Sequence, residues 1–208
     1  MAVTDAYATA AEYRTVAGKS DTSADAQILI DLTACTRLFE RESGQFFTKD
    51  ATAVNRVFRA KWSDWLDLTY EGGCPGIATT SGLVIKVDTD GDESFADETA
   101  WATTDYELHP LQAAFGGEVK PWTDIKVTRN GTQRFIPGGL VQVTAVFGWP
   151  AVPAAVKADV IELCRLWRVE TPRASGRILE IEEATATSPL MMSLVTRIRT
   201  AYRSKVTL

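Results

Sequence analysis

The segment DTDGDE, residues 88–93, has carboxylates at alternate positions, the spacing at which an EF-hand loop offers oxygen ligands to calcium. The match fails at two places. Counting from Asp88, the sixth residue is Glu93 where the sharp turn requires glycine, and the twelfth is Thr99 where a bidentate glutamate is required. The preceding LVIKV alternates like a strand, whereas an EF-hand has a helix there. We therefore predict the tip of a β-hairpin and no metal site.

Other kinds of catalytic site have few residues to use. His109 is the single histidine of the 208-residue chain, so a Ser-His, Cys-His or multi-histidine site has at most this residue. Cys35, Cys74 and Cys164 are far apart and form no CxxC pair; we expect Cys35 and Cys164 in a core and Cys74 in a flexible turn. Neither GxGxxG nor GxxxxGK[ST] occurs. The sequence therefore predicts no cofactor and no enzymatic activity.

Two segments have the apolar periodicity of amphipathic helices, with residues recurring at i, i+4, i+7 and i+11. These residues are Ile28, Leu32, Cys35 and Phe39 in the first segment and Val156, Val160, Leu163 and Trp167 in the second. Ser23 is the expected N-cap of the first helix and Gly44 its stop, while Pro153 suits the first turn of the second. We expect the two stripes to pack against each other.

Helices are also predicted near both ends of the chain. A short helix is expected over residues 5–16 with Thr4 as a possible cap, and a last helix starts at Ser188-Pro189. Residues 173–187, rich in Ala, Ser and Thr, are expected to form a connector before it.

Residues 48–147 change to a period of two and contain short alternating runs separated by Gly, Pro, Asn and Asp. Asp90-Gly91 and Asn130-Gly131 predict two hairpins. The sequence Gly148-Trp149-Pro150 ends this block, and the helical pattern then resumes. The predicted fold class is α+β: a small helical bundle with a long antiparallel β-strand insertion and a C-terminal helix.

The expected organisation is stated by ranges. These are N-terminal bundle helices over 1–47, the β insertion over 48–149, a further bundle helix over 150–172, and a connector with the C-terminal helix over 173–208.

The net charge of −5 is unevenly distributed. Nine acidic residues and no Lys or Arg lie between Val87 and Val119, whereas the chain after Glu183 has four basic residues and no acidic one. Opposite fields at two ends of the molecule, or simply two solvated faces, would both follow. No apolar run approaches the roughly 20 residues of a membrane span, so we expect no membrane contact and no secretion.

Four stretches together resemble the head-tail connector (adaptor) proteins of long-tailed bacteriophages. They are YRTVAGKSDTSADAQILIDLTACTRLFERESGQFF, VDTDGDESF followed by TDYELHP, RFIPGGLVQVTAVFGWPAVPAAVKADVIELCRLW, and the arginine-rich terminal helix. The most specific phrase is the strand that ends in Gly-Trp followed by the VPAAVKAD helix start.

The resemblance implies a structural virion protein of the phage neck. Such a protein forms a ring of twelve subunits beneath the portal protein, extends the DNA channel and receives the next neck protein, a stopper or tail-completion protein. DNA would pass through without sequence-specific binding. The expected location is the virion at the head-tail interface, with assembly in the host cytoplasm.

Two surfaces are candidates for this role. The predicted portal-docking residues of the last helix are Met191, Leu194, Arg197, Ile198, Arg199, Tyr202 and Arg203. The apolar part of this face is too large to leave in water, and the two core stripes already satisfy one another; a fourth helix folded back on its own bundle is the alternative. The acidic residues Asp88, Asp90, Asp92 and Glu93 are predicted to line or rim the channel, or else to form an outward-facing hairpin.

A second function stays open. The chain has six tryptophans, which could stack on sugars or bases, so a β-rich module that recognises a glycan or a host factor is the alternative to the connector. Five of them lie in or beside the β block without basic residues interleaved, which favours core or subunit contacts.

Overall fold

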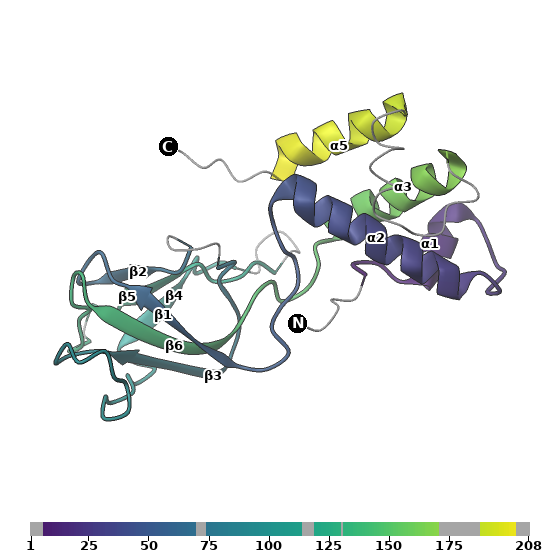
Figure 1. Ribbon diagram of the computed structural model, residues 1–208. Coiled ribbons are helices and arrows are strands. Elements are labelled where there is room, and N and C mark those ends of the chain that lie inside the picture. Colours follow the sequence, from purple (N-terminus) through teal and green to yellow (C-terminus); the bar gives the residue numbers. More distant parts are fainter. Residues whose placement is uncertain (1–5, 70–73, 114–118, 130, 171–187, 203–208) are drawn as a thin grey trace. The chain divides into compact units, whose positions relative to one another are not determined.

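The computed structural model describes residues 6–69, 74–113, 119–129, 131–170 and 188–202 (Figure 1). The chain divides into two compact units. A helical unit comprises Met1–Phe46 and Val152–Leu208, and a β unit comprises Phe47–Ala151. The predicted α+β class is confirmed. None of the helices in the described part of the chain is long and apolar enough to cross a membrane.

Helix α1 (Ala10–Ala17) begins five residues later than its sequence pattern suggested. Thr9, not Thr4, is the N-cap, and it forms a capping box with Glu12: the Thr9 hydroxyl accepts from the Glu12 N–H at 3.1 Å, and the Glu12 carboxylate accepts from the Thr9 N–H at 2.7 Å. Gly18 ends the helix in the left-handed conformation. The capping box sets the start of the helix at Thr9 because it satisfies two backbone N–H groups at once.

Helix α2 (Asp25–Ser43) ends at Gly44 as predicted, but Ser23 is not its cap. The N-cap is Ala24, without a side-chain hydrogen bond, because the Ser23 hydroxyl donates to Asp21 instead at 2.6 Å. The buried face of α2 is wider than the single stripe in the sequence. It is made of Ile28, Asp31, Leu32, Ala34, Cys35, Thr36, Leu38, Phe39, Glu40 and Ser43.

The width of this face lets α2 pack against three other helices: α1, α3 (Ala154–Glu170) and α5 (Pro189–Tyr202). The stripe of α3 is buried as predicted, from Val156 to Trp167, and Cys35 and Cys164 lie in the core. Burial and the neighbouring Cys164 raise the pKa of the Cys35 thiol well above its ordinary value, so this thiol stays protonated and unreactive.

The β unit has two three-stranded antiparallel sheets. One sheet has the order β1-β6-β3, from Val54–Arg59, Leu140–Phe147 and Ile77–Val87. The other has the order β2-β5-β4, from Trp65–Asp67, Asp124–Val127 and Tyr106–His109. Neither predicted hairpin is present, because β3 and β4 belong to different sheets, as do β5 and β6. Asp90-Gly91 lies in the connection between β3 and β4, whereas Asn130 lies outside the described residues.

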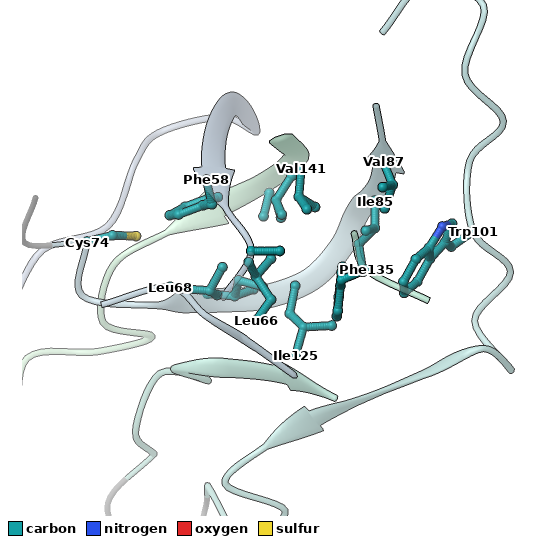
Figure 2. Close-up of a cluster of buried hydrophobic side chains, with 14 of the residues drawn as sticks. Phe58, Leu66, Leu68, Cys74, Ile85, Val87, Trp101, Ile125, Phe135 and Val141 are labelled. Carbon is teal, nitrogen blue, oxygen red and sulfur yellow. The ribbon is translucent and has the colours of Figure 1, made fainter. Parts of the chain in front are cut away.

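The core of the β unit lies between these sheets (Figure 2). Phe58, Val141 and Ile85 come from the first sheet, and Leu66 and Ile125 from the second; all are buried. The run QRFI, residues 133–136, is one of the alternating runs from which strands were predicted, but it has no strand structure. Its phenylalanine is nevertheless a core residue, since the Phe135 ring stacks on Trp101 at 4.6 Å. The alternating pattern of this run thus reflects the burial of Phe135 and does not indicate pairing with another strand.

Cys74 was expected in a flexible turn, and it does lie outside the helices and strands, but its side chain is buried. Its side chain is 5% exposed and belongs to the core of the β unit. Burial raises the pKa of its thiol, although Arg56 partly offsets the effect. The flanking glycines and proline suggested a loop, but they do not show which way the side chain between them points.

Gly148 explains why the strand block ends at Gly-Trp-Pro. It bridges antiparallel to Lys49, where the chain enters the β unit, and has φ +124°. A Cβ atom at Gly148 would lie 2.2 Å from the Thr48 carbonyl oxygen and 2.4 Å from the Lys49 Cα. Only glycine allows this approach. The Trp149 ring then packs on Phe47 at 5.0 Å, closing the base of the insertion.

Gly148→Ala should therefore lower the free energy of unfolding by about 3 kcal/mol or more, since backbone strain and a clash with backbone atoms add. Gly91→Ala is the matched control: Gly91 has φ +80° but nothing within 4 Å of the added Cβ, so strain alone should cost about 1–2 kcal/mol. Urea unfolding measures both. Equal effects of the two substitutions would contradict the close approach at Gly148.

Candidate assembly surfaces

Helix α5 does not present its apolar face to solvent. Met191 and Ile198 are completely buried and Leu194 nearly so, against α2 and α3. The expectation that this face lacks a partner within the chain is wrong. The two core stripes were assumed to satisfy each other completely, whereas α2 has a second apolar row, Ala34 and Leu38, beside the first. The fourth helix folded back on its bundle, the alternative derived from the sequence, is what the structure shows.

Polar contacts hold α5 in the same position. Arg199 Nε donates to Glu42 Oε2 at 2.5 Å, and Arg197 Nη2 donates to Asp159 Oδ1 at 2.5 Å. The Tyr202 ring packs at a tilt against Phe39, with ring centroids 5.1 Å apart. Two predicted docking cations are thus paired inside the chain, and Arg203 lies outside the described residues.

One end of the helical unit gathers exposed apolar side chains. The Asp31–Arg168 ion pair places the start of α2 beside the end of α3. The pairs made by Arg197 and Arg199 place the second half of α5 at the opposite end, so α5 starts at the same end as α2. The exposed apolar residues of this end are Val16, Leu29, Ile30, Val169, Leu190 and Met192. We call them the apolar end.

Within the apolar end lies a pocket of about 430 Å³ whose wall includes a buried ion pair. Asp31 is 2% exposed; it pairs with Arg168 and accepts from Gln27 Nε2 at 2.8 Å. The Arg168 guanidinium carbon lies 6.0 Å from the centroid of the Tyr13 ring. The polar groups of Asp31 are therefore used in joining α2 to α3, which is a structural role.

The β unit carries an acidic segment, residues 88–98, with Asp88, Asp90, Asp92, Glu93, Asp97 and Glu98. Asp88 differs from its neighbours because it is 5% exposed and accepts from the backbone N–H groups of Gly91 and Glu93 at 2.7 and 3.1 Å. Asp88 was predicted among the carboxylates that line or rim the channel, but its buried carboxylate accepts hydrogen bonds that stabilise this turn. The exposed carboxylates are those of Asp90, Asp92, Glu93 and Asp97.

Asp88, Asp90 and Glu98 bring carboxylate oxygens within 4.8 Å of one another. Hydrogen bonds account for this arrangement, because both Asp88 oxygens accept from the backbone and Glu98 accepts from the Thr89 N–H at 2.6 Å. The cluster therefore stabilises a turn. The absence of a metal site stays a prediction.

The same unit has a basic border, defined by Arg59, Lys61, Lys126, Arg129 and Arg134. Three of them, Lys126, Arg129 and Arg134, line a shallow pocket of about 560 Å³ together with Asp64 and Glu107. Arg59 is the last residue of β1, and the connection to β2 follows it. Trp62, in that connection, is 50% exposed.

The tryptophans give little support to a stacking platform. Trp101 and Trp167 are buried, Trp149 packs on Phe47, and the Trp65 indole N–H donates to Asp124 at 2.8 Å. Trp62 is the one exposed large ring among the six, all of which the structure describes. His109 lies 3.7 Å from Glu107 and beside the Trp65 ring. Among the described residues, no serine or cysteine nucleophile hydrogen-bonds to it.

Comparisons with known proteins give one kind of match. No protein family matches the sequence, and no curated protein does either. A chain in a solved structure described as the neck of an empty GTA particle, computed with C6 symmetry, matches with a TM-score of 0.50. The two sequences are 22% identical, and the match covers 96% of this chain and 92% of that chain. The likeness is therefore one of fold over almost the whole of both chains.

Ile198→Ala tests the burial of α5. Removing a completely buried side chain between α2 and α3 should cost about 2–5 kcal/mol. Met192→Ala, on the exposed side of the same helix, should stay within about 0.5 kcal/mol of wild type. Urea unfolding followed by circular dichroism at a helix band measures both. A chain truncated after Thr187 should lose helical structure or aggregate. An unchanged melting temperature would instead mean that α5 is not part of the core of the helical unit.

The Arg199–Glu42 pair predicts an acid sensitivity. Burial raises the pKa of Glu42, but hydrogen bonds from Arg199 and Arg41 outweigh it, so the pKa lies below the ordinary 4.5. The resulting stability is fully present above about pH 4.5 and is lost as the pH falls through the folded-state pKa. Glu42→Gln should cost about 1–3 kcal/mol at neutral pH and weaken the loss of stability on acidification. Asp97→Asn, at an exposed site, is the control; the same slope in all three proteins would refute the contribution of the pair.

Proposed function

We propose that this protein is a structural component of a phage neck: the adaptor ring that joins the portal protein to the next neck protein and extends the DNA channel. The observation that carries the proposal is the shared fold. A helical unit interrupted by a β unit matches a chain in the neck of a GTA particle over nearly all of both chains. The resemblance of the sequence to head-tail connectors is independent support.

A ring of twelve subunits is the proposed assembly. The matched structure of the GTA particle neck was computed with C6 symmetry, and a ring of twelve copies is compatible with a sixfold axis. The protein would act by position and contact, without catalysis, and DNA would pass through the ring without sequence-specific binding.

The apolar end is the surface that we assign to the portal protein. It gathers large apolar side chains in solvent, which is typical of a surface covered in an assembly. It includes the exposed start of α5, so the predicted docking helix keeps a role, but through Leu190 and Met192 and not through its buried face. Repetition around a ring would turn a weak contact per subunit into strong overall binding.

Mixing the protein with the portal protein of the same genome tests this function. Electron microscopy of negatively stained mixtures should show an added ring on the portal. Leu190→Glu/Met192→Glu should abolish the ring without changing the melting temperature, because both side chains are exposed. Leu111→Glu, at a residue 69% exposed in the β unit, is the matched control and should leave the ring intact. A wild-type protein that never joins the portal would refute the proposed function.

A further inference from the structure

The two charged surfaces of the β unit begin beside different outer strands, with β6 between them. In the sheet β1-β6-β3, β1 and β3 are the outer strands. The acidic segment follows β3 and folds back along its outer edge, since the Trp101 N–H donates to the Ile85 carbonyl at 2.9 Å and Lys86 Nζ donates to the Phe95 carbonyl at 2.6 Å. The basic border starts at the end of β1 and continues toward β2. Figure 1 shows β3 and β2 on opposite sides of the unit.

We propose that the acidic segment of one copy docks on the basic border of the next copy, and that this contact closes the ring. The inference rests on the proposed function and names the surfaces through which the subunits associate. A head-to-tail interface brings two different patches together, and such an interface generates a ring when the rotation from one copy to the next closes. The acidic segment borders β3, whereas the basic border runs from the end of β1 to β5 of the second sheet, so each surface can meet the other surface of a neighbouring copy.

The charges are complementary. The acidic segment has six carboxylates and no cation. The basic border has five cations, and with Asp64 and Glu107 of its pocket it keeps an excess of positive charge. Arg59 and Arg134 donate to backbone carbonyls, of Gly138 at 2.6 Å and of Gly131 at 2.8 Å. These bonds orient the guanidinium groups without neutralising them. Complementary fields of this kind select the partner and speed association.

The basic border also has the apolar anchor that an interface needs. Exposed ion pairs contribute only about 0–1 kcal/mol each, so charge alone would not hold a ring. Trp62 and Val57 are 50% and 51% exposed, and the Lys61 ammonium lies 5.6 Å from the Trp62 ring centroid. The residues that contribute most of the binding energy of protein interfaces are often tryptophan, tyrosine and arginine, and the basic border combines an exposed tryptophan with arginines. On the acidic side, the hydrogen-bonded turn at Asp88 presents its carboxylates in a fixed conformation.

A charge-exchange experiment tests the interface. One variant, Asp90→Lys/Asp92→Lys/Glu93→Lys/Asp97→Lys, leaves two carboxylates against four lysines in the acidic segment and so makes both surfaces basic. A second variant, Lys61→Glu/Arg134→Glu, leaves three cations in the basic border against four acidic residues, counting Asp64 and Glu107, and so makes it acidic. The six substituted residues are exposed, so both variants should keep the wild-type melting temperature. Sedimentation velocity should show that each variant alone associates at least about tenfold more weakly than wild type. An equimolar mixture of the two should associate again, because unlike variants then alternate around the ring. High salt should weaken wild-type association.

The outcomes separate the two proposals. If the wild-type protein forms rings on the portal but the variants assemble as well as it does, or if mixing them fails to restore association, this interface is wrong and the neck function stands. If the wild-type protein neither self-associates nor joins the portal, both are wrong. A basic border that binds duplex DNA in fluorescence anisotropy, with assembly unaffected by Lys61→Glu/Arg134→Glu, would make it a nucleic-acid surface and overturn the inference.

Discussion

The close approach of Gly148 to Lys49 is the constraint on which the two-unit organisation depends. The chain enters and leaves the β unit side by side, held by the antiparallel bridge and by the Asp50 N–H, which donates to the Phe147 carbonyl at 2.8 Å. A long insertion can therefore begin and end at one place, between α2 and α3, which then pack as if consecutive. The glycine is required because any Cβ would overlap backbone atoms.

The sequence pattern predicted what depends on local chemistry. The α+β class, the stripes of α2 and α3, the stop at Gly44 and the start of α5 after Ser188 all follow from periodicity and capping. The sheet partners did not follow, because Asp90-Gly91 and Asn130-Gly131 favour a turn without specifying whether the flanking strands pair with each other. Here β3 pairs with β6 and β5 with β2, which are not their neighbours in the sequence, and only β4 and β5 pair as consecutive strands among the named ones.

The candidate surfaces were predicted less well, for a physical reason. An amphipathic helix looks the same whether its apolar face meets its own chain or a partner, and only the width of the facing surface on α2 decides. The burial of Met191 and Ile198 could have been suspected from the second apolar row at Ala34 and Leu38. The apolar end and the basic border gave no signal, since each is assembled from residues far apart in the sequence.

The buried polar groups of the helical unit serve to hold its helices together, and the features that can bind other molecules lie on the surface. The ion pairs at Asp31, Glu42 and Asp159 join helices to one another, while apolar and charged patches remain for other molecules. A cryo-electron microscopy reconstruction of the neck of particles from the same genome tests the central claim most directly. The account predicts a ring of this chain between the portal and the next neck protein. A neck without density for this fold would contradict it.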